Sequence, residues 1–314
     1  MMVASFLPAF VYGQSVYPSR PIRMVIPFAA GGAIDMMARP VGKKLQELLG
    51  QPVVIDNRGG AGGNIGAELV AKSSPDGYSL LMGSTSPLAI NPAYFSRMSY
   101  DVLRDFTPIA QIVQQPLIIV TNLSQPFRNI QDVVAFAKRN PGKLNYGSAG
   151  LGTSNHLVGE MLSNSAGIKM EHVPFSGGAP ALVALLGGQI ELLITQPNTV
   201  LTHVKSGRVR ALATTGSKRS PAYPDVGTLV EAGYKDLDVV GWYCIVGPAN
   251  MPRPIVDRLN ADIRRAIASP EVHDALIAEG TEPTTGSPEE LGILMKTELE
   301  RWAKVVKRAG IKSD

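Results

Sequence analysis

Short apolar runs alternate with longer amphipathic stretches through the first third of the chain. Apolar runs at 23–26, 52–56 and 79–83 predict strands. Between them, apolar residues recur at helical spacing over 35–49, where Gly50 ends the pattern, and again over 65–72. Strands and helices in strict alternation indicate a βαβαβ unit, and therefore a parallel sheet with right-handed crossovers.

A second series of the same kind follows. We expect the extended runs at 109–113 and 117–121 to carry the chain from one lobe to another. Alternating helices and strands are then predicted at 130–139, 144–146, 153–166, 170–173, 180–186, 192–194, 198–206 and 209–214. The apolar run 239–246 is expected to return to the first lobe, and three amphipathic helices close the chain at about 252–268, 270–279 and 288–308.

These patterns predict an α/β fold of two lobes, each a mainly parallel sheet flanked by helices. Residues 17–118 and 240–314 would form lobe 1, and residues 119–239 would form lobe 2. The 314 residues of the chain are enough for two lobes of this size.

Glycine-rich turns join a strand to a helix in both series. Gly31 and Gly32 follow the first strand, and Gly150 and Gly152 follow the strand at 144–146. A third turn of this kind, residues 174–180, precedes Pro180 at a helix start. Such turns expose free backbone N–H groups at the positive end of a helix dipole, which makes them anion sites. We therefore expect two lobes that hold one anionic ligand from both sides.

Other polar residues stand at the ends of the same strands. Ser84, Thr85 and Ser86 follow the strand 79–83, where open α/β sheets bind their ligands, although a turn capped by these hydroxyls is an equal alternative. Asp35 near the first helix N-terminus would orient the turn, and His156 would hold the 148–152 loop.

Composition and charge exclude several classes of function. The net charge is +4 and no dense run of Lys and Arg occurs, so we expect no nucleic-acid partner. The single cysteine, Cys244, lies in an apolar run and is expected to be a buried, inert thiol. No His or Cys cluster has zinc-site spacing, so neither a metal nor a cofactor is predicted.

The N-terminus is apolar and ends in small residues. Residues 1–16 are typical of the end of a secretory signal peptide that lacks its charged start, and a disordered apolar tail is the alternative. An exported protein is the expectation that follows.

Two enzyme hypotheses compete with a binding protein. The loop 60–66 is rich in glycine, but Ile65 stands where a dinucleotide fingerprint needs its third glycine. Ser148 lacks the G-x-S-x-G context of a nucleophile elbow, yet a Ser148–His156 pair is conceivable. An α/β enzyme that acts on a carboxylate therefore stays the alternative.

The order of motifs along residues 17–312 resembles one family. The sequence runs through Tyr17-Pro18-Ser19-Arg20-Pro21-Ile22, Pro27-Phe28 and Gly31-Gly32, Asn57-Arg58-Gly59-Gly60-Ala61-Gly62-Gly63-Asn64, Asp76-Gly77-Tyr78, Tyr146-Gly147-Ser148, His172-Val173-Pro174-Phe175, Leu186-Gly187-Gly188-Gln189 and Glu231-Ala232-Gly233-Tyr234. This resembles the Bordetella uptake gene family, the extracytoplasmic solute receptors of tripartite tricarboxylate transporters.

The resemblance implies a periplasmic binding protein with a two-lobe Venus flytrap fold. It implies a small organic mono- or dicarboxylate as ligand, membrane permease subunits of a tripartite tricarboxylate transporter as partners, and a monomer. The alternative is that the protein is a ligand-sensing periplasmic receptor rather than the receptor of a transporter. Carried over to this sequence, the ligand contacts would be Phe28, Ala29, Ala30, Gly31, Gly32, Ser84, Thr85, Ser86, Ser148, Gly152, Thr153, Phe175, Ser176, Gly177, Gly178, Ala179 and Gln196.

The chain departs from the family pattern at two places. Ala30 stands where the first turn usually has a proline, which would loosen that loop. After the strand 192–194, Thr195-Gln196-Pro197-Asn198 replaces an aspartate that is common in the family. An acidic group there can bind a ligand amine, so its loss favours a plain carboxylate over an amino acid.

Overall fold

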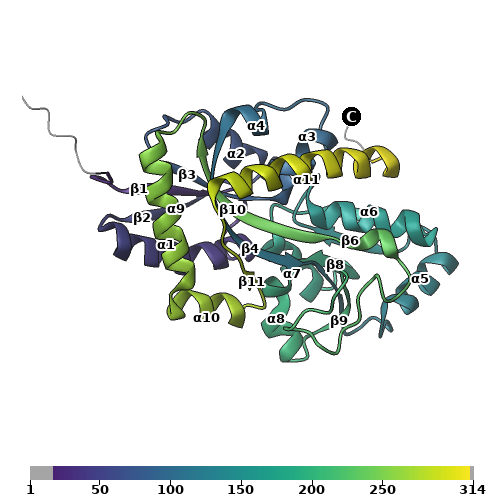
Figure 1. The fold of residues 1–314 in the computed structure, drawn as a ribbon. Helices are drawn as coiled ribbons and strands as arrows, with labels where there is room; N and C mark the ends of the chain where they lie inside the picture. Colours follow the sequence, from purple (N-terminus) through teal and green to yellow (C-terminus); the bar gives the residue numbers. More distant parts are fainter. Residues whose placement is uncertain (1–16, 312–314) are drawn as a thin grey trace, which may run out of the picture.

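Two sheets organise the computed structural model, which describes residues 17–311 (Figure 1). The expected signal segment, residues 1–16, lies outside the described residues. The first sheet has the strand order β11-β4-β10-β3-β1-β2. Its strands are β1 (Ile22–Ile26), β2 (Val53–Asn57), β3 (Ser79–Ser84), β4 (Phe106–Pro116), β10 (Val240–Pro248) and β11 (Glu282–Pro283).

The second sheet lies beside the first and belongs to the middle of the chain. Its strand order is β7-β6-β8-β5-β9. Its strands are β5 (Ile118–Asn122), β6 (Asn145–Ser148), β7 (Glu171–Pro174), β8 (Leu192–Thr195) and β9 (Val209–Thr214). The predicted α/β fold with two lobes is thus confirmed.

Both sheets are mixed, which corrects the expectation of mainly parallel sheets. β1 pairs in parallel with β2 and β3, but β10 runs antiparallel between β3 and β4. In the second sheet β6 is parallel to β7 and β8, whereas β5 runs antiparallel between β8 and β9. The antiparallel strands flank the places where the chain passes between the sheets, and such strands need no helical crossover.

Helices cover both faces of each sheet. Around the first sheet lie α1 (Ala33–Leu49), η1 (Ala61–Gly63), α2 (Asn64–Ala71), η2 (Ser86–Ile90), α3 (Asn91–Tyr94), α4 (Val102–Asp105), α9 (Arg253–Ala268), α10 (Pro270–Ala278) and α11 (Pro288–Ala309). Around the second lie α5 (Ile130–Arg139), α6 (Ser154–Ala166), α7 (Gly178–Leu186), α8 (Pro197–Lys205) and η3 (Lys235–Leu237). No helix within residues 17–311 is long and apolar enough to cross a membrane.

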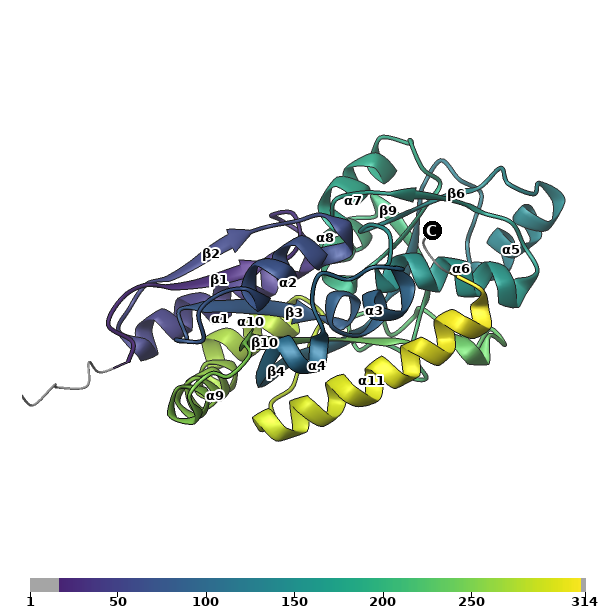
Figure 2. The same ribbon diagram turned by 90° about the horizontal axis from the view of Figure 1, so that it is seen from above.

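Three apolar cores hold these layers together. One packs α1, α9 and α10 onto the first sheet, and another packs α7 and α8 onto the second. The third core is continuous beneath both sheets and includes side chains of α6 and α11. Figure 2 shows α11, in yellow, running from the first sheet toward α6. There the side chain of Asn164 donates a hydrogen bond to the carbonyl of Ala309 (3.2 Å).

The chain passes between the sheets at two connections, which are hydrogen-bonded to each other through one residue. The first connection is Leu117, between β4 and β5, and the second leads from Thr214 to β10. Thr215 joins them, because its hydroxyl accepts a hydrogen bond from the N–H of Leu117 (2.7 Å) and donates one to the carbonyl of Val239. The N–H of Thr215 also donates to the carbonyl of Leu117 (2.8 Å). Leu117, Thr215 and Val239 are buried, so this one threonine cross-links the first connection to both ends of the second.

Candidate functional site

The N-termini of four helices meet in a pocket between the two sheets. They belong to α1, which begins at Ala33, and to α6, α7 and α8, whose pocket residues are Ser154, Gly178 and the N-cap Gln196. The pocket is lined by Phe28, Gly32, Ala33, Ile34, Ser84, Thr85, Ser86, Ala149, Ser154, Asn155, Gly178, Gln196 and Tyr243. Each helix brings the positive end of its dipole to this space.

Three of these termini, those of α1, α7 and α8, have no side-chain cap, and α8 begins with Pro197, which has no N–H to offer. Gly32 is the N-cap of α1 and Gly177 is the N-cap of α7, and neither helix has a side chain that accepts its first N–H groups. The first turn of a helix has donors without an intrahelical partner. The N-termini of α1 and α7 therefore offer unpaired donors from opposite walls of the pocket.

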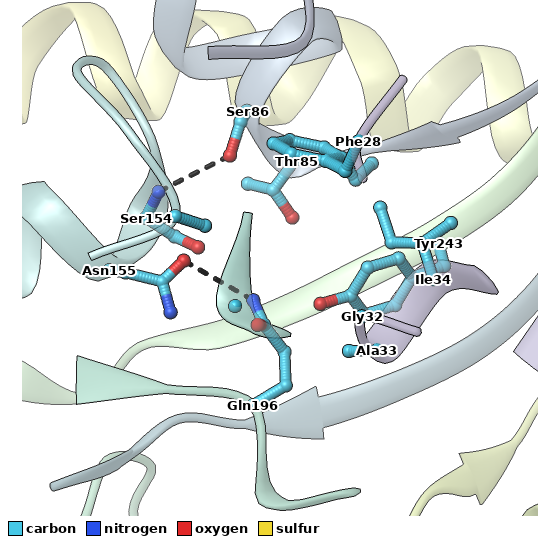
Figure 3. A pocket seen from close by; sticks show the side chains of 13 residues that line it. Phe28, Gly32, Ala33, Ile34, Thr85, Ser86, Ser154, Asn155, Gln196 and Tyr243 are labelled. Carbon is cyan, nitrogen blue, oxygen red and sulfur yellow. Dashed lines mark hydrogen bonds between the residues drawn. The ribbon is translucent and has the colours of Figure 1, made fainter. Parts of the chain in front are cut away.

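Hydroxyl groups add side-chain donors and acceptors on the first-sheet side. The buried hydroxyl of Ser84 has no hydrogen-bond partner, and that of Thr85 accepts from the N–H of Trp242 (2.9 Å). The Ser86 hydroxyl accepts from the N–H of Ser154 (3.2 Å), so it joins the two walls (Figure 3). These three residues, predicted from the end of β3, are thus placed together in the pocket.

Amides form the opposite wall. The side chain of Asn155 donates to the carbonyl of Ile194 (3.0 Å) and accepts from Gln196 (3.4 Å), which orients both amides. Figure 3 shows the Tyr243 hydroxyl pointing toward Gln196. Burial raises the pKa of Tyr243 to about 12, against the opposing effect of Gln115 and Gln196. The phenol therefore stays neutral and can donate a hydrogen bond.

The pocket is small and its lining carries no charged side chain. Its volume is about 20 Å³, where roughly 10–15 Å³ is enough to hold one water. A group of the size of a carboxylate fits this space. Because the lining offers N–H groups, hydroxyls and amides, an anion bound there would be held by dipoles alone.

Asp35 holds the first glycine turn, as the sequence predicts. Its buried carboxylate accepts from the N–H of Gly31 (2.9 Å), from Arg39 (2.9 Å) and from the amide of Asn57 (3.1 Å). Burial acts to raise the pKa of Asp35, but these hydrogen bonds outweigh it and hold the pKa below its usual value. Asp35 does not itself line the pocket. It holds the glycine turn in place, and Phe28 and Gly32 of that turn line the pocket.

Ser148, an expected ligand contact, is not among the residues that line the pocket. Its hydroxyl is fully buried, lies 2.6 Å from Nε2 of His172 and accepts from the N–H of Gly150 (3.0 Å). The ring of His172 stacks on His156 with ring centroids 4.1 Å apart. Nδ1 of His156 faces the N–H of Gly152 (3.4 Å), so the histidines support this loop from behind.

Thr153 also acts within the loop rather than in the pocket. It is the N-cap of α6: its hydroxyl accepts from the N–H of His156 (3.4 Å) and donates to the carbonyl of Gly150 (2.6 Å). Gly152 has a φ of +73°, and a Cβ there would lie 2.6 Å from the side-chain oxygen of Asn91. Glycine is required at this position by backbone geometry and space.

The structure therefore divides the predicted contacts. Phe28, Gly32, Ser84, Thr85, Ser86, Gly178 and Gln196 line the pocket. Ala29, Ala30, Gly31, Ser148, Gly152, Thr153, Phe175, Ser176, Gly177 and Ala179 stand in the adjoining turns and are not part of the lining. Sequence reasoning missed Ala33, Ile34, Ala149, Ser154, Asn155 and Tyr243. The first-turn positions of α1 and α6 could have been found from the helix starts alone, because first-turn N–H groups bind anions.

The structure also bears on the enzyme hypotheses. The Ser148 hydroxyl contacts His172 rather than His156, and it is fully buried. Cys244 is buried too, and burial raises the pKa of its thiol. Within residues 17–311, no cluster of three His, Cys, Asp or Glu side chains could hold a metal ion.

Comparison with known proteins places the chain in a family. The model of the tripartite tricarboxylate transporter family receptor matches residues 37–311. The structure of the periplasmic binding protein BugD has a TM-score of 0.91 at 36% identity, over 95% of this chain and 100% of that one. The structure of Rpa4515 of R. palustris with adipate has a TM-score of 0.91 at 35% identity, over 94% of this chain and 99% of that one. The structure of MatC from Rhodopseudomonas palustris with bound malate has a TM-score of 0.89 at 32% identity, over 92% of this chain and 100% of that one. The chain is therefore a member of the tripartite tricarboxylate transporter receptor family.

Proposed function

We propose that this protein is a periplasmic receptor that captures a small organic mono- or dicarboxylate for a tripartite tricarboxylate transporter. The observation that carries the proposal is the meeting of four helix N-termini in one pocket without a charged side chain. An anion is the ligand that such a set of dipoles favours. Family membership and the adipate and malate in the two Rhodopseudomonas relatives support the same ligand class.

Capture would proceed by closure of the two lobes, which we assign to residues 17–118 with 240–314 and to 119–239. Hydrogen bonds between the walls belong to the closed form: Ser154 donates to Ser86 and the amide of Asn198 donates to the carbonyl of Ala33 (3.1 Å). A ligand that contacts both walls stabilises the closed form over the open one. The first wall would contribute Gly32, Ala33 and the Ser84–Ser86 hydroxyls, and the second Ser154, Gly178 and Gln196.

The role after capture would be transfer, not chemistry. The closed receptor would dock as a monomer on membrane permease subunits of the transporter. A sensory partner in place of a permease stays the second candidate, and co-purification with either membrane protein separates the two.

Isothermal titration with acetate, butyrate, succinate, malate, adipate and citrate tests the proposal. At least one carboxylate should bind and raise Tm in a dose-dependent way, as linkage requires of a ligand of the native state. Matched primary amides of the same acids are the control, since they lack the charge that the dipoles favour. The absence of binding by every carboxylate, or equal binding of acids and amides, would overturn the proposal.

A further inference from the structure

A second hollow, which we call the side groove, adjoins the pocket. This side groove has a volume of about 470 Å³ and lies between the loop 60–63 of the first lobe and Leu151, Pro174 and Phe175 of the second, with Phe95 at its border. Phe28 and Ala149 line both the pocket and the side groove. The two spaces are therefore neighbours with a common wall.

The sizes of the two spaces differ greatly. The pocket has about 20 Å³ and accepts little more than a carboxylate group. The remainder of a larger ligand needs room elsewhere, and the side groove next to it offers about 470 Å³. A ligand with its carboxylate among the helix N-termini would thus extend past Phe28 into the side groove.

The chemistry of the side groove is apolar. Its side chains are aromatic or aliphatic apart from Ser176, and no charged residue is part of its lining. A second carboxylate placed there would lose water against mainly aromatic and aliphatic side chains, which is costly. Leu151 stays 44% exposed at the edge of the groove, and contact with an apolar group would remove part of this surface from water.

We propose that the preferred ligand is a monocarboxylate with an apolar tail of aliphatic or aromatic carbon, the tail lying in the side groove. The proposal rests on the proposed function and names its substrate class. Phe28 lines both spaces, so the tail would pass its ring. The ring of Phe28 lies close to Gly63. A Cβ at that position would be only 3.2 Å from the ring edge, so a glycine makes room for the ring.

Two series of acids of equal length test the tail. Isothermal titration compares butyrate, hexanoate and octanoate with succinate, adipate and suberate. The affinity of the monoacids should rise about two- to fourfold for each added methylene. Hexanoate and octanoate should bind at least tenfold more tightly than adipate and suberate. Affinity that is independent of tail length, or diacids that bind as tightly as monoacids, would overturn the inference and leave the carboxylate receptor intact.

Variants of the groove locate the tail. Leu151→Ser should lower the affinity for octanoate about fivefold or more and leave that for butyrate unchanged, because only the longer tail reaches the groove. Leu123→Ser is the matched control, since Leu123 is 46% exposed and lies outside both spaces. Phe175→Ser should act like Leu151→Ser. An equal loss for butyrate and octanoate would contradict a tail site, and no binding of any acid in either series would instead contradict the proposed function.

Discussion

The hydroxyl of Ser148 and Nε2 of His172 lie 2.6 Å apart, on neighbouring strands behind the second glycine turn. This contact makes Ser148 a support of the loop. The N–H of Gly150 donates to the same hydroxyl (3.0 Å), so one side chain connects the loop to β7.

Ser148→Ala should therefore destabilise the protein more than it weakens ligand binding. The substitution leaves a part-buried imidazole nitrogen and the buried N–H of Gly150 without their partner, which costs about 1–3 kcal/mol. Urea unfolding measures this free energy, and titration with the bound carboxylate measures affinity. Ser163→Ala is the control: the buried Ser163 hydroxyl has no partner, so its loss should be nearly neutral. A stable Ser148→Ala protein with more than tenfold weaker binding would instead place the hydroxyl in the site.

Gly32→Val should weaken carboxylate binding at least tenfold and lower Tm only modestly. The backbone of Gly32 (φ −81°, ψ 173°) is open to any residue, but a Cβ there would lie 3.3 Å from the carbonyl oxygen of Ala29, a tight contact to which the turn must adjust. A Cβ there would lie 3.9 Å from the N–H nitrogen of Gly178 across the cleft, where it crowds the anion site. Gly292→Val serves as the control, because a Cβ at Gly292 meets only Pro108 at 3.6 Å. Equal affinity of both variants would remove Gly32 from the site.

Stability should fall as the pH drops below about 6.5. Burial lowers the pKa of His156 to about 4, and burial together with the neighbouring His156 lowers the pKa of His172 to about 3. The unfolded chain, with histidine pKa values near 6.5, then binds protons that the folded protein does not. The free energy of unfolding therefore falls as the pH drops from about 6.5 to about 4 because of His156, and to about 3 because of His172, by up to about 1.4 kcal/mol per pH unit for each histidine.

Chemical unfolding at a series of pH values measures this slope. His172→Gln should reduce the slope by about half, whereas His273→Gln should leave it unchanged because His273 is exposed. The groups that face the stacked pair are Tyr146 of β6, Tyr94 of α3 and Glu160 of α6. A slope that survives His172→Gln unchanged would assign the effect to other groups.

Asn198→Ala should lower carboxylate affinity about fivefold. Its amide donates to the carbonyl of Ala33 (3.1 Å), a bond between the two proposed lobes that their opening would break. One such bond is worth about 1 kcal/mol, and its loss shifts the population toward the open form. Asn122→Ala is a matched control, because Asn122 donates to the carbonyl of Leu185 within the second lobe (2.8 Å). Small-angle scattering should show a more open molecule for Asn198→Ala alone.

Local pattern predicts the helices and strands of this chain well. The predicted helix 35–49 is observed as Ala33–Leu49, and the strand 209–214 is observed at the same residues. Gly50 ends α1 in a left-handed conformation, as a glycine C-cap does. Apolar periodicity and helix-ending glycines are local signals, which involve residues only a few positions apart. A single sequence is therefore enough to locate these helices and strands.

The site depends on pairings that local pattern does not contain. Tyr243 reaches the pocket because β10 runs antiparallel to β3 and sets it opposite Ser84. Ser148 turns to His172 because β6 and β7 pair in a register that puts His172 opposite Tyr146. Glycine turns and helix starts could be predicted as donors, but which side chains face the cleft is decided by strand order and direction.

Thr215 gives the cleft a mechanical consequence. Because Thr215 forms hydrogen bonds with both Leu117 and Val239, the first connection and the two ends of the second would move together. In the proposed closure, the lobes would then turn about a single axis beside Leu117. A ligand of different length would change the angle through which the lobes turn, but not the direction. One receptor architecture could in this way accept new cargo by exchanging residues of the cleft, while the surface presented to a membrane partner keeps its orientation.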